Sequence, residues 1–202
     1  MNYGETLAYW YLRFNGFFPL RNFVLHPLQE RMGDDNQTAD CDLLAVRFPH
    51  VYEEIGGQSD DWDPRLSTWG FSLDEDIIGL IVEVKTSPNA ESARIERISF
   101  HRRRLSQAVQ RLGMFEREET TSITDELLRN AISTKQGSYR IGKLLFSERA
   151  MRGAWLNITL QESEQFIRDR LQKYSDPKRQ ARMFFPDELI QYLAWQASIT
   201  SS

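Results

Sequence analysis

The chain has 202 residues, of which 41% are hydrophobic, and it contains a single cysteine, Cys41. This length is enough to bury one substantial core, so we expect a single soluble domain over residues 1–202, located in the cytoplasm. The sequence has no apolar run long enough to cross a membrane and no signal segment after Met1, and one cysteine excludes an internal disulfide and a cysteine-based metal site.

The net charge of −4 is unevenly distributed along the chain. Residues 53–76 contain eight carboxylates and one base, Arg65, whereas residues 94–111 contain six arginines and one acid, Glu96. A local basic surface can bind nucleic-acid phosphates although the protein as a whole is acidic. The overall charge therefore does not exclude a nucleic-acid-binding protein.

The first 48 residues predict one helix and two strands. Residues 5–15 form an amphipathic helix, because apolar side chains recur at spacings of three and four, and Gly16 follows as a left-handed cap. Residues 17–25 predict a strand in which Pro19 marks an edge or a bulge. A polar turn at 33–38 precedes a second strand at 41–48.

Residues 77–85 predict a central strand, since they are almost entirely apolar until the last three residues. The acidic insert 49–76 before it is long for a hairpin loop. Asp60 to Asp63 are expected to be solvated. Trp62 and Trp69 indicate either a protein interface or local packing.

The rest of the chain predicts alternating helices and strands. Helices are expected at 100–112, at 124–133 with Thr124 as the cap, at 161–174 and at 186–197, and strands at 139–146 and 155–160. The fold class is α/β or α+β, a mixed central sheet flanked by helices in the order α-β-β-β-α-α-β-β-α-α. Residues 1–146 would form the core and residues 161–198 a helical C-terminal part.

Chemistry is expected where the strand 77–85 ends. Residues two apart face the same side of a strand, so Glu83 and Lys85 project together, and Asp42 can lie beside them if the two strands are neighbours. Two carboxylates, the backbone carbonyl of Val84 and water molecules would suit Mg²⁺, for which Mn²⁺ can substitute. Lys85 would hold or activate the attacking water.

These residues resemble the PD-(D/E)XK, or restriction-endonuclease-like, superfamily, whose core has a Glu on the first helix, an Asp on a strand and a central strand ending in Glu-x-Lys. The matching positions are Gly4-Glu5, Asp42 to Ala45, and Ile81 to Thr86. The resemblance covers residues 1 to about 112 and implies an α-β-β-β-α-β core. It also implies a divalent-metal-dependent nuclease with catalytic residues Glu5, Asp42, Glu83 and Lys85, and metal ligands among Asp42, Glu83, Val84 and Glu5.

Some assignments within this resemblance stay open. Cys41 stands where the superfamily name has a Pro, and Asp40 competes with Asp42 for the metal role. Gln107 is the candidate for a Gln that many members carry on the following helix, with Gln110 second. We expect phosphate contacts from exposed arginines of that helix, on the side away from its apolar stripe: Arg103, Arg104 and Arg111.

The resemblance suggests an endonuclease acting on DNA, and by extension the nuclease of a bacterial restriction or anti-phage system. Two alternatives remain: a catalytically silent nuclease-like module for nucleic-acid binding or assembly, and a toxin-like RNase. A homodimer or a partner protein of a larger complex is considered for each, and no membrane partner is expected. The absence of a Gly-rich phosphate loop argues against a nucleotide-hydrolysing motor within this chain.

Overall fold

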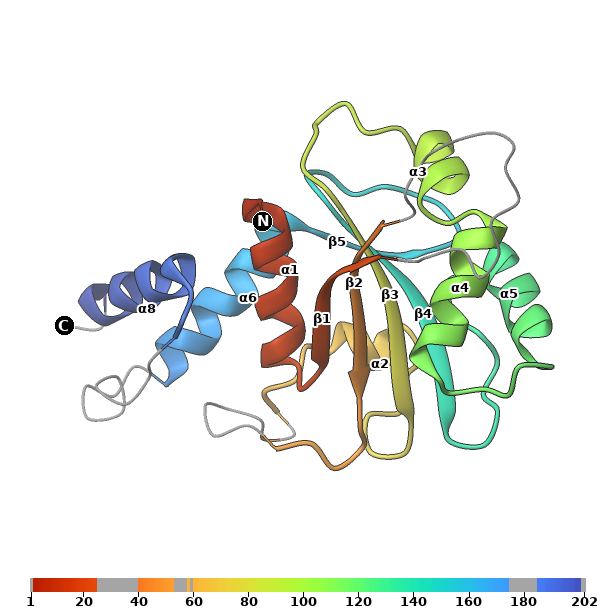
Figure 1. Cartoon of the computed structure of the whole chain (residues 1–202). Helices are drawn as coiled ribbons and strands as arrows, with labels where there is room; N and C mark the ends of the chain where they lie inside the picture. Colours follow the sequence, from red (N-terminus) through yellow and green to blue (C-terminus); the bar gives the residue numbers. More distant parts are fainter. Residues whose placement is uncertain (1, 25–39, 53–57, 59, 175–184, 201–202) are drawn as a thin grey trace.

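The protein is described by a computed structural model that covers residues 2–24, 40–52, 58, 60–174 and 185–200. A five-stranded sheet lies between helices, as Figure 1 shows. The expected polar turn at 33–38 lies outside the described residues. The elements in chain order are α1 (Tyr3–Phe14), β1 (Phe18–Val24), β2 (Asp40–Arg47), α2 (Arg65–Thr68), β3 (Ile77–Lys85), α3 (Ser92–Ile98), α4 (Arg102–Leu112), α5 (Thr120–Arg129), β4 (Tyr139–Ser147), β5 (Leu156–Thr159), α6 (Leu160–Lys173) and α8 (Glu188–Thr200).

Helix α1 begins at a capping box, which the sequence analysis did not predict, and Gly16 follows its C-cap residue Asn15. The Asn2 side chain accepts a hydrogen bond from the Glu5 N–H at 2.9 Å, and the Glu5 carboxylate accepts from the Asn2 backbone in return. This exchange satisfies two backbone donors that the helix itself cannot pair. Gly16 follows with a φ of 78°, which confirms the left-handed cap.

The sheet is mixed, with strand order β1-β2-β3-β4-β5. Strands β1, β2 and β3 are antiparallel neighbours, whereas β4 and β5 run parallel to β3. The structure thus confirms the mixed α/β class and the neighbouring positions of β2 and β3. Strand β3 is central and buried from Ile78 to Val84, and Pro19 lies on the edge strand β1, as expected.

Each face of the sheet carries a hydrophobic core. Alternation along β3 directs Leu80 and Val82 towards α1 and α6, and Ile81 towards α4 and α5. Helix α8 packs on α6 and adds Ile190 and Leu193 to the first core. The face that carries α4 is also the one to which Glu83 and Lys85 belong by the same alternation.

The helical predictions differ from the structure at three points. The helices α2 and α3 were not predicted: α2 has four residues, and the seven residues of α3 contain a single fully buried apolar side chain, Ile95. Thr124 is not a helix cap, as it lies inside α5, where its hydroxyl donates to the Thr120 carbonyl at 2.7 Å. A buried threonine can satisfy its hydroxyl within its own helix, which sequence pattern alone does not distinguish from a cap.

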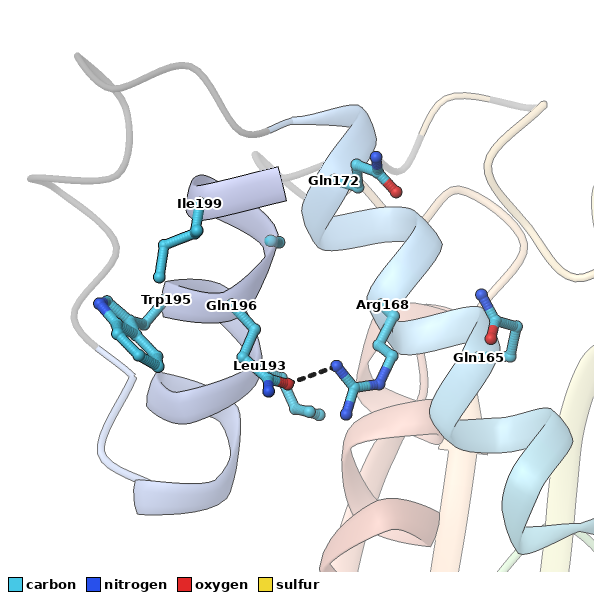
Figure 2. Close-up of a pocket in the computed structure, with 8 residues that line it drawn as sticks. Gln165, Arg168, Gln172, Leu193, Trp195, Gln196 and Ile199 are labelled. Carbon is cyan, nitrogen blue, oxygen red and sulfur yellow. Dashed lines mark hydrogen bonds between the residues drawn. The ribbon is translucent and has the colours of Figure 1, made fainter. Parts of the chain in front are cut away.

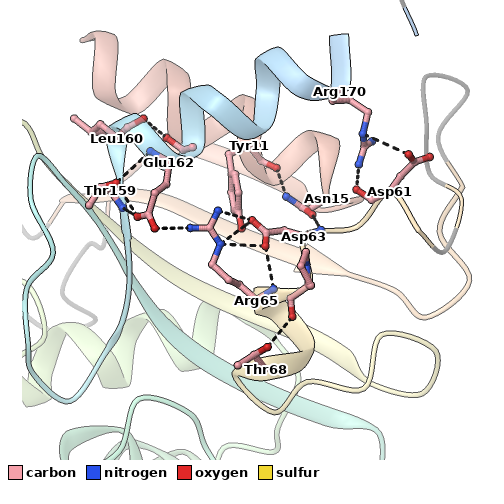
Figure 3. Close-up of polar contacts among 12 residues, drawn as sticks. Tyr11, Asn15, Asp61, Asp63, Arg65, Thr68, Thr159, Leu160, Glu162 and Arg170 are labelled. Atoms are coloured by element: carbon pink, nitrogen blue, oxygen red, sulfur yellow. Dashed lines mark hydrogen bonds and ion pairs between the residues drawn. The ribbon is translucent and has the colours of Figure 1, made fainter. Parts of the chain in front are cut away.

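The acidic insert is tied to the core instead of being solvated. Asp61 and Asp63 are 6% and 2% exposed, so the prediction of solvated acids is wrong for both. Asp63 accepts hydrogen bonds from the Tyr11 hydroxyl at 2.8 Å and from Arg65, and the Asp61 backbone carbonyl accepts one from Arg170 of α6. Figure 3 shows these contacts running from the insert to α1 and α6.

The tryptophans of the insert take part in local packing. The guanidinium groups of Arg47 and Arg170 lie 4.9 and 6.0 Å from the Trp62 ring, and Trp69 packs against the first core. Arg47 is 1% exposed and donates to the Leu73 carbonyl at 2.6 Å. Of the two readings of these aromatic residues, the structure favours packing.

Candidate functional site

Asp42 and Glu83 face each other where β2 begins and β3 ends. The antiparallel register pairs Leu43 with Val82, so the next step places Asp42 opposite Glu83. The Asp42 Oδ2 atom accepts a hydrogen bond from the Val84 N–H at 2.7 Å, which fixes the carboxylate against β3. The structure thus brings together two of the acids that the sequence analysis selected.

Glu83 is a buried carboxylate held by two cations. Its side chain is 4% exposed, its Oε1 atom pairs with the Lys85 ammonium, and its Oε2 atom accepts from Arg104 Nη2 at 2.8 Å. A buried carboxylate requires such partners because it has lost its hydration. Lys85 and Arg104 together balance the charge of Glu83.

Arg104 does not lie where the sequence analysis expected it. The prediction placed it on the exposed side of its helix, but it is 6% exposed and reaches Glu83 across the α4 face of the sheet. It precedes Leu105 and follows Arg103, so helical rotation turns it inward and leaves Arg103 in solvent. Arg103 and Arg111 are exposed, as expected.

Burial and the neighbouring charge of Glu83 raise the pKa of Asp42 to about 6. Two carboxylates that face each other in a partly buried space disfavour double ionisation. Burial also raises the pKa of the adjacent Cys41 thiol to about 12, so this thiol is protonated and unreactive. At this site the pKa shift that favours a change of protonation near neutral pH is therefore that of Asp42 and not that of Cys41.

Glu5 is close in the fold to the end of β3 but is engaged elsewhere. Gly4 packs so tightly that an added Cβ would lie 2.6 Å from Thr86 Cγ2 and 2.9 Å from Val84 Cγ1. The Glu5 carboxylate meanwhile accepts from the Asn2 side-chain amide at 2.7 Å. These contacts place the start of α1 at the end of β3, on the face of the sheet opposite to Glu83, and a metal-binding role for Glu5 stays a prediction.

The donor set fits a hard divalent cation that retains water. Asp42 and Glu83 supply two carboxylates, and Mg²⁺ commonly takes one or two such ligands together with several waters. A bound cation would relieve the repulsion from Glu83, which adds to burial in raising the pKa of Asp42. Over the described ranges of the chain, no group of three or more His, Cys, Asp or Glu side chains is placed to hold a metal ion.

The structure relates the remaining candidate residues less closely to Asp42 and Glu83. Gln107 is half-buried one helical turn after Arg104, on the same side of α4, whereas Gln110 is exposed. The structure brings Val84 to the site through its N–H group, and a metal-binding role for its carbonyl stays a prediction. The side chain of Asp40 lies outside the described part of the structure.

Lys143 of β4 is a buried cation that the sequence analysis did not select. It pairs in register with Ile81, is 2% exposed, and places its ammonium 5.4 Å from the Phe100 ring centroid. Burial lowers its pKa to about 8, and Glu96 partly opposes this shift. The sequence feature that could have identified Lys143 is its position as a lysine between apolar residues of a predicted strand.

A cavity of about 430 Å³ lies between α6 and α8 (Figure 2), and Asp42 and Glu83 are not among the residues that line it. Its lining is mostly apolar or neutral and includes Trp195, Ile199 and Gln165. Arg168 is the charged lining residue, and it donates to Gln196 at 2.6 Å. This cavity lacks an acid or nucleophile among its lining residues.

None of the helices in the described residues is long and apolar enough to cross a membrane.

A comparison of the chain with protein-family models, curated proteins and solved structures found no match. The family resemblance seen in the sequence therefore stays a prediction. Function has to be inferred from the geometry of Asp42, Glu83, Lys85 and Arg104.

Proposed function

We propose that this protein is a divalent-metal-dependent endonuclease that hydrolyses phosphodiester bonds in DNA. The observation that carries the proposal is the position of Asp42 beside the end of β3, where its carboxylate accepts from the Val84 N–H at 2.7 Å and is affected by the charge of Glu83, with Lys85 on the same side of β3 as Glu83. Two acids and one amine at the end of a buried strand are the groups that metal-assisted phosphodiester hydrolysis needs.

The order and direction of the strands support a restriction-endonuclease-like fold. Helix α1 and the antiparallel strands β1, β2 and β3, followed by helices and the parallel strand β4, agree with the α-β-β-β-α-β core that the resemblance implies. Fold alone does not establish activity, so the proposal depends on the site residues.

In the proposed reaction, Asp42 and Glu83 would hold Mg²⁺ or Mn²⁺ at the end of the sheet. When bound, the cation polarises the phosphate and lowers the pKa of a water molecule. Lys85, which is one-third exposed, faces this position from β3 and orients the attacking water or stabilises the negative charge on the phosphate. The exposed Arg103 and Arg111 of α4 would contact the DNA backbone.

A catalytically silent nucleic-acid-binding or assembly module is the second candidate. It is favoured by one observation: both oxygen atoms of Glu83 are engaged by Lys85 and Arg104, so the carboxylate is neutralised by protein groups. A toxin-like RNase would use the same residues as the endonuclease. A restriction or anti-phage role is a further expectation from the resemblance.

The test is cleavage of supercoiled DNA, linear DNA and labelled RNA with Mg²⁺, Mn²⁺ or chelator. Glu83→Gln and Lys85→Gln should each reduce the cleavage rate by about 10²- to 10³-fold, because each removes a group that stabilises charge in the transition state. Glu118→Gln, at an exposed position after α4, serves as the control and should cleave as the wild type does.

The outcomes separate the candidates. Chelator-sensitive DNA cleavage that requires Glu83 and Lys85 supports the endonuclease, and selective cleavage of RNA supports the RNase. Stable DNA binding without turnover in either metal supports the silent module and contradicts the endonuclease.

A further inference from the structure

The two cationic side chains that contact Glu83 differ in their exposure to solvent. Lys85 is 34% exposed at its side chain, whereas Arg104 is 7% exposed. Each takes a different oxygen of the carboxylate, Oε1 for Lys85 and Oε2 for Arg104. The two sides of Glu83 are therefore not equivalent.

Arg104 is fixed by its surroundings. Leu105 and Ala108 are fully buried in the second core, so α4 is anchored against the sheet on the side from which Arg104 reaches Glu83. Moving the guanidinium away would deprive the buried Glu83 carboxylate of one of its two cationic partners, which carries a large penalty. We therefore expect Arg104 to stay on Oε2.

Lys85 can leave Oε1 when another cation takes its place. It lies at the last position of β3, next to an exposed Thr86, and its ammonium is carried on a flexible four-carbon stem. An ammonium that moves from Oε1 towards solvent regains hydration. Oε1 is also the Glu83 oxygen that lacks the Arg104 contact.

We propose that Arg104 is a positioning residue that holds Glu83 through Oε2, while Lys85 and a divalent cation exchange for one another at Oε1. This inference rests on the proposed function, because it assumes that Glu83 binds a cation. In the metal-free protein Lys85 keeps Oε1 neutralised. Displacement by the cation frees its ammonium for the phosphate or water that enters the site.

The two neighbours of Glu83 should therefore affect cation affinity in opposite directions. We would titrate the full chain with Mn²⁺ by calorimetry, without DNA, so that the measurement does not depend on activity. Lys85→Met should tighten binding by about tenfold because it removes the competing ammonium. Arg104→Met should weaken binding by about tenfold because it releases the orientation of Glu83.

Two further variants serve as controls. Arg129→Met changes an exposed arginine at the end of α5 and should leave Mn²⁺ affinity unchanged. Arg104→Lys retains a positive charge near Oε2 and should restore most of the affinity that Arg104→Met loses. If Arg104→Met does not fold, Arg104→Lys and the partly exposed Lys85→Met still test the proposal.

The results that would overturn the inference are specific. Tighter or unchanged Mn²⁺ binding by Arg104→Met would show that Arg104 does not position Glu83 for the cation. Unchanged or weaker binding by Lys85→Met would show that Lys85 is not the group that the cation replaces. A wild type that binds no Mn²⁺ contradicts the proposed function itself, and the inference with it. Binding with the wrong order of variants contradicts only the inference.

Discussion

Two clusters of buried acidic and basic side chains, one in the acidic insert and one at the end of β3, are similar in composition but differ in how their negative charges are compensated. In the insert, Asp61 accepts hydrogen bonds from Lys173 at 2.8 Å and from the Tyr174 hydroxyl at 2.6 Å, in addition to its pairing with Arg170. At the end of β3, Asp42 instead faces a second carboxylate, Glu83. In the insert, hydrogen-bond donors surround the carboxylates. In the candidate site, the Asp42 carboxylate lies near a second carboxylate, that of Glu83.

The pKa values of the two aspartates shift in opposite directions. Burial acts on both, but at Asp61 the hydrogen bonds from Lys173 and Tyr174 outweigh it and lower the pKa. At Asp42 burial and the charge of Glu83 act together and raise the pKa to about 6. Carboxylates whose ionised form is stabilised by hydrogen bonds, as in the insert, have a structural role. A carboxylate whose ionised form is disfavoured, such as Asp42, is a better candidate for ligand binding.

Breaking the insert network should produce the largest effect on stability. Asp63→Ala leaves Arg65 and the Tyr11 hydroxyl without their shared acceptor, and we expect the free energy of unfolding to fall by about 3 kcal/mol. Chemical denaturation would measure this loss. Asp74→Ala, at an exposed position in the same segment, should change stability by less than about 0.5 kcal/mol. Equal effects of the two substitutions would show that the network does not anchor the insert.

The pH dependence of stability should distinguish the two clusters by sign. Because the folded pKa of Asp42 exceeds its ordinary value of 3.8, its ionisation lowers stability as the pH rises from about 4 to about 6. Asp42→Asn should therefore gain stability relative to the wild type by on the order of 1 kcal/mol over this interval, measured with chelator present.

Asp61 should behave in the opposite way. Its folded pKa is lowered, so its contribution to stability is present above about pH 4 and is lost as the pH falls further. Asp61→Asn should consequently be more destabilising near neutral pH than in acid. Parallel pH profiles for the Asp42 and Asp61 variants would remove the distinction between the two clusters.

The smallest expected effect concerns the exposed arginines of α4. Arg103→Ala should weaken DNA binding of the Glu83→Gln protein, and the slope of log affinity against log salt concentration should become shallower by about 0.9. Arg129→Ala, at an exposed position at the end of α5, is the control and should leave the slope unchanged. An unchanged slope for Arg103→Ala would place the DNA contact elsewhere.

The sequence predicted the strands that position the site because their patterns are local. The apolar run of β3 sets both its bounds and its central position, and the structure agrees with the predicted range 77–85. Neighbouring β2 and β3 then suffice to bring Asp42 to Glu83. Predicted and observed bounds agree well where the sequence pattern of a single segment determines the element.

The rest depended on contacts between distant segments. Arg104 was misplaced because a basic residue beside an apolar stripe is usually solvated, and only the position of Glu83 across the sheet turns it inward. Asp61 and Asp63 were misjudged for the same reason, since Tyr11 and Arg170 lie far from them in the sequence. Such charge partners cannot be read from periodicity.

The edge strand β1 has a consequence for aggregation. Phe18 and Leu20 are 53% and 59% exposed, and an edge strand with apolar side chains can recruit a strand from another molecule. Pro19 between them has no N–H to donate, and Asn22, at a φ of 50°, interrupts the extended backbone two residues after Leu20. These two residues shorten the stretch over which a foreign strand could pair. Pro19 is thus a position at which a substitution would favour self-assembly without touching the candidate site.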